Sequence, residues 1–156
     1  MFSECLNKNT HDSIQTVEDV LENLCDDTVT ELKKIYGTDY LRQTFEAIKD
    51  TEIFVIRLKS NNEPVGLYGL IPEGEQSAGI YLLTTKNLHN GNVITFLKEA
   101  RKQVKKWSEE YKLIMDNCYK QNKTIQKWLS LLGFQPSEYQ DNDFQIYFIG
   151  DLSLYQ

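Results

Sequence analysis

Cysteine is scarce in this sequence, and its arrangement suggests neither a disulfide framework nor a metal site. The three cysteines, Cys5, Cys25 and Cys118, lie far apart and form no C-x-x-C pair. An odd, sparse set argues against structural disulfides and against a cysteine-based zinc site. The two histidines, His11 and His89, are not spaced as a ligand pair either. We therefore expect no metal, and we expect a reducing, intracellular setting.

Long apolar runs are also missing. No run approaches the length of about 20 residues that a membrane-spanning helix needs. The first residues, Met1–Asp12, are polar and lack the apolar core of a secretory signal. We expect a protein that is neither embedded in a membrane nor secreted through a signal peptide.

Positive charge is in short supply, with 17 Lys and Arg against 23 Asp and Glu and a formal net charge of −6. A field of that sign does not attract nucleic acid or anionic lipid, so we expect neither as a partner. The exception is a basic stretch on one side of a predicted helix, formed by Lys98, Arg101, Lys102, Lys105 and Lys106. A solvated helix face is the default interpretation of such a stretch, and an anionic partner is the alternative. No aromatic residues alternate with these cations, so stacking on single strands is unsupported.

What remains is the composition of an ordinary globular protein. The chain has 156 residues, of which 40% are hydrophobic and 26% charged. That length allows a real core without cross-links, so we predict a single domain over residues 1–156. Residues 1–13 form either a poorly ordered segment or a first strand.

The spacing of apolar residues predicts a mixed order of helices and strands. A weak capping box at Thr16 and Asp19 opens a helix that Asp26-Asp27 interrupts and Gly37 ends. Further helices are expected over Asp39–Ile48, with Leu41, Phe45 and Ile48 facing inward, over Val93–Tyr111 and over Lys123–Leu132. The expected strands are Glu52–Leu58, Pro64–Ile71, Ser77–Leu83, Leu113–Cys118 and Phe144–Ile149. The first three are predicted to form an antiparallel meander.

One segment carries a family resemblance. Asn122–Phe134 follows a strand directly, and it resembles the part of GNAT-family N-acetyltransferases where Asn opens a helix that ends in Gly-Phe. Glu63–Gly66 resembles the family's turn into its third strand, and the order of elements matches from about residue 14 to residue 149. The resemblance implies an α/β, acyl-CoA N-acyltransferase fold, a mixed and mostly antiparallel sheet flanked by helices, with acetyl-CoA as the ligand.

A narrower resemblance rests on Phe96–Arg101, Trp107, Asn122 and Trp128–Phe134. These residues are similar to those of the GNAT-like proteins of tailed phages, a group that includes the podophage internal virion protein. This resemblance implies other phage or virion proteins as partners, and a location in the host cytoplasm or in the virion.

The acyl-CoA site that the resemblance implies departs from the family pattern. The family has Arg or Gln, two residues, Gly, one residue, then Gly or Ala where the fourth strand turns into a helix. The matching positions here are Leu88, Gly91 and Val93, so only the first glycine is kept. Backbone N–H groups at a helix N-terminus suit a pyrophosphate, and small residues let the backbone approach it. The resemblance gives these candidate cofactor-binding residues: Leu83, Thr84, Asn90, Gly91, Asn92 and Asn122. The simpler interpretation is that Asn90-Gly91 is only a turn that enters a helix.

The proton donor also departs from the pattern. In many GNAT enzymes a Tyr seven residues after the motif Asn protonates the departing thiolate, and here that position is Leu129. Tyr119 is the one nearby candidate for a substitute, with packing as its alternative role. Glu73 and Glu75 stand where the family often keeps a base, although acids in such a turn are usually just solvated. The sequence therefore favours a GNAT-fold protein with a degenerate site, weak or absent transfer and a structural or interaction role. The alternative is an active N-acyltransferase that acts on a small amine or a protein amine.

Overall fold

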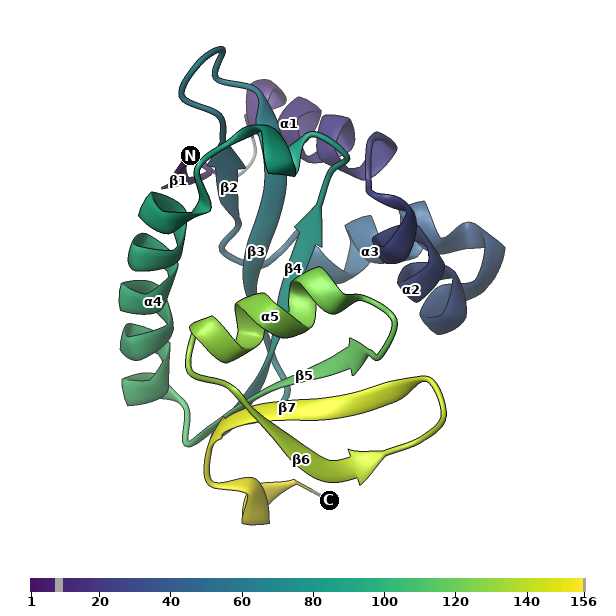
Figure 1. Cartoon of the computed structure of the whole chain (residues 1–156), viewed down its shortest axis with the longest axis vertical. Coiled ribbons are helices and arrows are strands. Elements are labelled where there is room, and N and C mark those ends of the chain that lie inside the picture. Colours follow the sequence, from purple (N-terminus) through teal and green to yellow (C-terminus); the bar gives the residue numbers. More distant parts are fainter. Residues whose placement is uncertain (8–9, 156) are drawn as a thin grey trace. The chain divides into compact units, whose positions relative to one another are not determined.

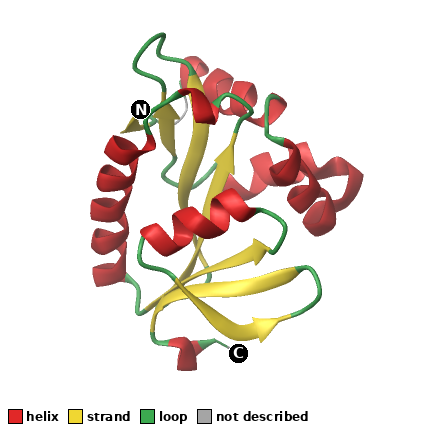
Figure 2. Ribbon diagram, in the orientation of Figure 1, coloured by secondary structure: helices red, strands yellow, loops and turns green. Residues whose placement is uncertain are grey.

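A computed structural model describes residues 1–7 and 10–155, and it divides the chain into two compact units. The first unit comprises Met1–Gly69 and Tyr81–Phe96, and the second comprises Leu70–Ile80 and Leu97–Gln156. Strands and helices occur in both units, and Figure 2 distinguishes the two kinds of element by colour. The described residues form a seven-stranded sheet in the order β1-β2-β3-β4-β5-β7-β6 (Figure 1).

The first unit contains the N-terminal strand and three helices. Its elements are β1 (Phe2–Cys5), α1 (His11–Glu22), α2 (Asp26–Tyr36), α3 (Tyr40–Ile48), β2 (Phe54–Arg57), most of β3 (Pro64–Pro72) and the end of β4 (Ser77–Thr84). A short 3-10 turn, η2 (Leu88–Asn90), precedes the start of α4 (Val93–Glu110). Strand β2 pairs antiparallel with both β1 and β3.

The second unit contains most of α4, then β5 (Leu113–Tyr119), α5 (Lys123–Leu131), β6 (Gln135–Gln140) and β7 (Phe144–Gly150). The start of β4 pairs in parallel with β5 over Ser77–Gly79 and Leu113–Met115. Strand β7 pairs antiparallel with both β5 and β6. The predicted fold class, a mixed and mostly antiparallel sheet with flanking helices, is confirmed.

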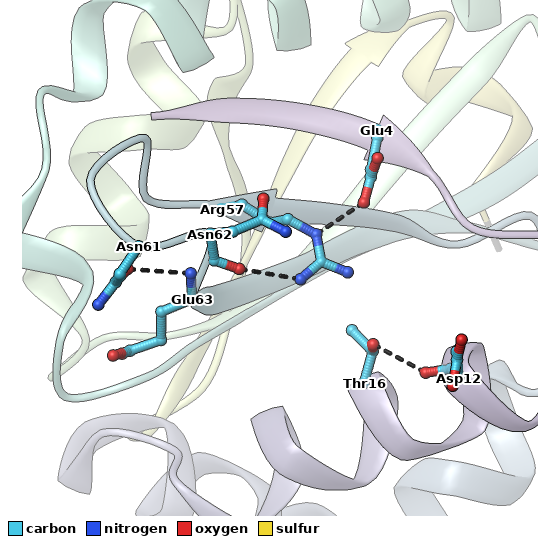
Figure 3. Close-up of polar contacts among 7 residues, drawn as sticks. All are labelled: Glu4, Asp12, Thr16, Arg57, Asn61, Asn62 and Glu63. Carbon is cyan, nitrogen blue, oxygen red and sulfur yellow. Dashed lines mark hydrogen bonds and ion pairs between the residues drawn. The ribbon is translucent and has the colours of Figure 1, made fainter.

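Helix α1 starts earlier than predicted. Its N-cap is Thr10, whose hydroxyl accepts a hydrogen bond from the Ser13 N–H at 3.1 Å. Thr16, the predicted cap, lies inside the helix and donates its hydroxyl to the Asp12 carbonyl at 2.9 Å (Figure 3). The prediction was wrong because the first turn of α1 is polar, and apolar spacing reveals a helix only from its first buried residue, Val17.

Two strands, β1 and β6, have little apolar signal. Strand β1 falls within the segment predicted as either a first strand or poorly ordered, of which residues 8 and 9 lie outside the described part. It is tied to β2 by an ion pair between Glu4 Oε1 and Arg57 Nε at 2.6 Å, and Arg57 also donates to the Asn62 carbonyl (Figure 3). Strand β6 was not predicted, because Ser137 is its one buried residue and no apolar alternation exists to detect.

The inward face of α3 differs from the prediction. Leu41 is 37% exposed, whereas Thr44 and Ile48 are buried. Ile35 of α2 is also an exposed apolar residue. The predicted interruption is confirmed, since α1 ends at Glu22 and α2 begins at Asp26.

Helix α5 ends in a Schellman motif. The Phe134 N–H donates to the Leu129 carbonyl at 2.9 Å, and the Gly133 N–H donates to the Ser130 carbonyl at 3.1 Å. Gly133 has φ of +100°, which a residue with a Cβ adopts only at a cost. The sequence-based prediction that Gly133 stops this helix is confirmed.

Gly133→Val should therefore destabilise the fold by about 1 kcal/mol or more, because a branched side chain is strained at positive φ. Gly133→Asn is the matched control, since asparagine tolerates the left-handed region and should cost less. Thermal unfolding of both variants tests the assignment. An unchanged melting temperature for Gly133→Val would contradict it.

Candidate functional site

The end of β4 has a hydrogen-bonded neighbour on each edge. The Thr85 N–H donates to the Val65 carbonyl of β3 at 2.9 Å. Neighbouring residues of a strand direct their backbone groups to opposite edges. On the edge opposite β3, the Thr84 carbonyl accepts from the Cys25 N–H at 3.0 Å, and the Lys86 N–H donates to the Asn23 carbonyl at 3.2 Å. Residues 23–25, which connect α1 to α2, therefore cover this edge, and we call them the connector.

Side chains strengthen the same contact. Cys25 Sγ lies 3.1 Å from Thr28 Oγ1 and 3.4 Å from Thr84 Oγ1. Both threonines are buried, as is Leu83, which precedes Thr84 in β4. Leu83 and Thr84, two of the candidate ligand residues, are thus packed into the first unit, and the Thr84 hydroxyl and carbonyl both contact the connector.

The loop between β4 and α4 uses its own N–H groups. The N–H groups of Leu88, Asn90 and Gly91 donate to the carbonyls of Thr85, Asn87 and Leu88 at 3.3, 3.0 and 3.3 Å. The Leu88 side chain, at the position where the family has Arg or Gln, is 7% exposed. The loop therefore closes on itself as the turn η2, with an apolar side chain buried where a phosphate-binding cation is expected.

The packing of neighbouring side chains requires a glycine at position 91. A Cβ at this position would lie 2.3 Å from Met1 Cγ and 2.7 Å from Leu58 Cδ2. Met1 is 4% exposed, and its ammonium group donates to the Asn92 carbonyl at 3.3 Å. The space that Gly91 leaves is filled by the N-terminal residue of the chain.

The start of α4 does not match a pyrophosphate site. Asn92 Oδ1 accepts the Ile94 N–H at 3.0 Å, so the side chain caps an N–H group of the first turn. Val93 places a branched side chain at the first helical position. Together with the closed turn and the buried Leu88, these features do not fit the acyl-CoA pyrophosphate. The structure does bring Asn90, Gly91 and Asn92 together as one loop.

Asn122 lies in the second unit as the N-cap of α5. Its side chain is 1% exposed, and Oδ1 accepts the Ile125 N–H at 3.4 Å. Within residues 1–7 and 10–155, its Nδ2 has no hydrogen-bond partner. A buried, unpaired amide is costly, so this nitrogen is an unused hydrogen-bond donor. Leu129, at the position of the family's Tyr, is fully buried.

Tyr119 lies at the end of β5 and is 7% exposed. It is the cross-strand neighbour of Phe144, with ring centroids 5.7 Å apart. This placement matches the packing role, and proton donation by Tyr119 stays a prediction. Glu73 and Glu75 are both exposed in the turn before β4, and Glu73 Oε1 lies 3.0 Å from where a Cβ of Gly79 would be.

Sequence reasoning missed Tyr81, a buried tyrosine of β4 whose hydroxyl donates a hydrogen bond inside the protein. Its hydroxyl lies 2.9 Å from Thr51 Oγ1, which donates in turn to the Ile48 carbonyl at 2.7 Å. Tyr81 must therefore be the donor of the first bond. Burial raises the pKa of Tyr81 well above its usual value. Gly69 makes room for this hydroxyl, since a Cβ there would lie 2.5 Å from it. No sequence motif marks the group, and its chemistry is structural.

Comparison with known proteins identifies the fold. No family model and no curated protein matches the sequence. Among solved structures, a GNAT-family acetyltransferase from Bacillus anthracis has a TM-score of 0.66 at 15% identity and covers 96% of this chain and 95% of its own. The microcin C7 self-immunity acetyltransferase MccE, solved with acetyl-CoA and AMP, has a TM-score of 0.62 at 15% identity. The match covers 96% of this chain and 93% of MccE. An aminoglycoside 6′-N-acetyltransferase complexed with coenzyme A has a TM-score of 0.59 at 14% sequence identity. The match covers 95% of this chain and 94% of the acetyltransferase.

The chain thus has the GNAT acyl-CoA N-acyltransferase fold, as the motif around Asn122 predicted. In the part of the chain that the structure describes, no helix is long and apolar enough to cross a membrane. The same residues contain no group of three or more His, Cys, Asp or Glu side chains that could hold a metal ion.

Proposed function

We propose that this protein is a GNAT-fold protein that acts through interactions with other macromolecules and transfers acetyl groups slowly or not at all. The observation that carries the proposal is the seating of Met1 against Gly91. The glycine that would bring the loop backbone close to a pyrophosphate serves here to accommodate a side chain of the same protein. The hydrogen bonds within the loop and the buried Leu88 support the same conclusion.

We further propose a phage or prophage origin, with other phage or virion proteins as partners, and the host cytoplasm or the virion as the location. The support is the resemblance of Phe96–Arg101, Trp107, Asn122 and Trp128–Phe134 to the GNAT-like proteins of tailed phages. Trp107 and Trp128 are buried, so their role is in the core of the second unit and not in binding a partner.

Isothermal titration with acetyl-CoA is expected to show no sub-micromolar site. The reason is the combined loss of the cation at Leu88, of the small residue at Val93 and of the loop N–H groups. A tight site would contradict the proposal.

Gly91→Ala is a variant that separates the two roles of the glycine. If Gly91 accommodates Met1, the variant should lower the melting temperature, because a Cβ overlaps the Met1 side chain, and should leave the weak titration unchanged. If Gly91 approaches a pyrophosphate, the variant should instead weaken acetyl-CoA binding.

The second candidate function is an active acyl-CoA-dependent N-acyltransferase for a small amine or a protein amine. The observation that favours it is Asn122, whose buried Nδ2 has no partner within the described residues. An amide in that state suits a ligand carbonyl, and the fold is shared with enzymes solved with acetyl-CoA or coenzyme A. Asn122→Ala should then reduce acetyl-CoA affinity, and under the first proposal it should change only stability.

A further inference from the structure

An apolar pocket lies in the first unit, between α1, α3 and the residues that lead into β2. Its volume is about 230 Å³, and we call it the α1–α3 pocket. Its apolar lining consists of Leu6, Ile14, Val17, Phe45 and Ile53, all of which belong to the first unit. Val17 and Ile53 are buried, whereas Ile14 is 42% exposed. An apolar cavity of about 150 Å³ takes up benzene, so this pocket has room for one aromatic ring.

Two polar side chains of the pocket are already bonded within the protein. The Thr51 hydroxyl donates to the Ile48 carbonyl at 2.7 Å and accepts from the Tyr81 hydroxyl at 2.9 Å. The Lys49 ammonium forms an ion pair with Glu46 at 2.7 Å. A polar group placed in the pocket would lose its contacts with water and find few partners to replace them. The pocket therefore favours an apolar group.

A polar hollow adjoins the α1–α3 pocket. It has a volume of about 280 Å³ and is lined by Glu4 of β1, Arg57 of β2 and Asp12 of α1. It shares three lining residues with the pocket, Leu6, Asn7 and Ser13, so the two form one groove. Figure 3 shows Asp12 on α1 and, above this helix, the ion pair of Arg57 with Glu4. In the part of the chain that the structure describes, the Asp12 carboxylate has no ion-pair partner, so the hollow has an unbalanced negative charge.

The apolar surface extends beyond the pocket along α3. Leu41 precedes Phe45 by four residues, so the two side chains lie on the same side of the helix. Leu41 is exposed, and Phe45 is half-buried in the wall of the pocket. A single ring would fill the pocket but would leave both Leu41 and the polar hollow uncovered. A segment of protein chain is large enough to cover all three.

We propose that this groove binds a segment of a partner protein that carries one large aromatic side chain and, close to it in sequence, a lysine or arginine. The aromatic side chain occupies the α1–α3 pocket, and the cation lies beside Asp12. Aromatic side chains seated in apolar pockets supply much of the affinity of protein interfaces, and complementary charges add specificity. This inference rests on the proposed interaction role and names the chemistry of the partner.

Titration of the full chain with N-acetylphenylalanine amide, followed by heteronuclear NMR, tests the pocket. We expect saturable shifts concentrated at the residues that line it, and none with N-acetylalanine amide. Ile14→Glu should weaken binding by about tenfold or more, because it places a charge where the ring must be buried. Ile35→Glu is the matched control, since Ile35 is an exposed isoleucine of α2 that does not line the pocket, and it should bind like the native chain.

Selection from a random peptide library displayed on yeast tests the partner. The selected peptides should share one aromatic residue with a lysine or arginine within a few positions. Replacing that aromatic residue with alanine, or using the Ile14→Glu protein, should weaken binding by about tenfold or more. Asp12→Asn should weaken it by about threefold at low salt and less at high salt, because the contact is exposed and screened. Asp19→Asn changes an exposed acid of α1 outside the groove and should have no effect.

Shifts that do not saturate, that fall on other residues or that Ile14→Glu leaves intact would each overturn the inference. Binding of N-acetylphenylalanine amide without any peptide that depends on the groove would overturn the protein partner and leave a site for a small aromatic molecule. Unchanged circular dichroism will show that the variants are folded, and the alanine replacement in the peptide does not depend on a variant at all. The acetyl-CoA titration tests the proposed function separately, so an empty groove without a tight acetyl-CoA site overturns only this inference.

Discussion

Thiol release from acetyl-CoA, measured with polyamines, aminoglycosides and lysine peptides as acceptors, is expected to stay at or near the background rate. A positioned general acid contributes on the order of 10² to 10⁴ in rate. The position where GNAT enzymes often keep that acid is Leu129, which is fully buried. Tyr119, the substitute that the sequence suggests, packs against Phe144. An active aminoglycoside acetyltransferase assayed in parallel serves as the positive control.

Tyr119→Phe separates the two candidate functions. Robust turnover that this variant abolishes would make Tyr119 the acid and refute the interaction role. Robust turnover that survives the variant would refute that role as well, and would require a different proton donor. Background rates for both proteins are the expected outcome.

Gly150→Ala is expected to give the largest loss of stability among the glycine variants. Gly150 has φ of +102°, and a Cβ there would lie 2.1 Å from the Lys112 carbonyl oxygen. That oxygen is held in place because it accepts the Asp151 N–H at 2.8 Å. Left-handed strain and backbone overlap together should cost about 3 kcal/mol, a fall in melting temperature of roughly 10 °C for a chain of this size.

Gly74→Ala is the matched control for that measurement. Its Cβ would meet only Ser77 Oγ, at an ordinary 3.7 Å, and Gly74 does not have a positive φ. It should unfold within about 0.5 kcal/mol of the native chain. If Gly150→Ala behaved like this control, the close approach of β7 to Lys112 would be refuted.

Much of the fold could be predicted because its inner residues repeat at regular intervals. The long helix α4 was predicted from one continuous apolar face, and α5 from an Asn cap and a Gly-Phe end. The misses share a cause. The first turn of α1 and strand β6 bury almost nothing, so neither produces a hydrophobic pattern. Leu41 was misplaced because apolar spacing identifies a helix face from apolar residues alone, and the buried face of α3 includes Thr44, a polar residue.

For the candidate site, the sequence could predict which residues occupy the positions of the family motif, but not what those residues contact. The sequence suggested that Leu88 and Val93 do not match the family pattern. It could not suggest that Met1 fills the space at Gly91, because the two residues are 90 positions apart and no local pattern joins them. The pairing of the connector with Thr84 and Lys86 is equally non-local. Such contacts depend on tertiary structure, and a single sequence carries no periodicity that reports them.

The connector occupies the backbone hydrogen-bonding groups of β4 on the edge opposite β3, so it competes with any ligand for that edge. An extended ligand that pairs with Thr84 and Lys86 must first displace the hydrogen bonds of Asn23 and Cys25. Its apparent affinity is then its intrinsic affinity multiplied by the fraction of molecules with the connector open, so a 1% open fraction weakens binding about a hundredfold. By linkage, a ligand that does bind there must shift the junction between α1 and α2. Occupancy of this sheet edge would therefore be transmitted to α1 and α2, the two helices that the connector joins.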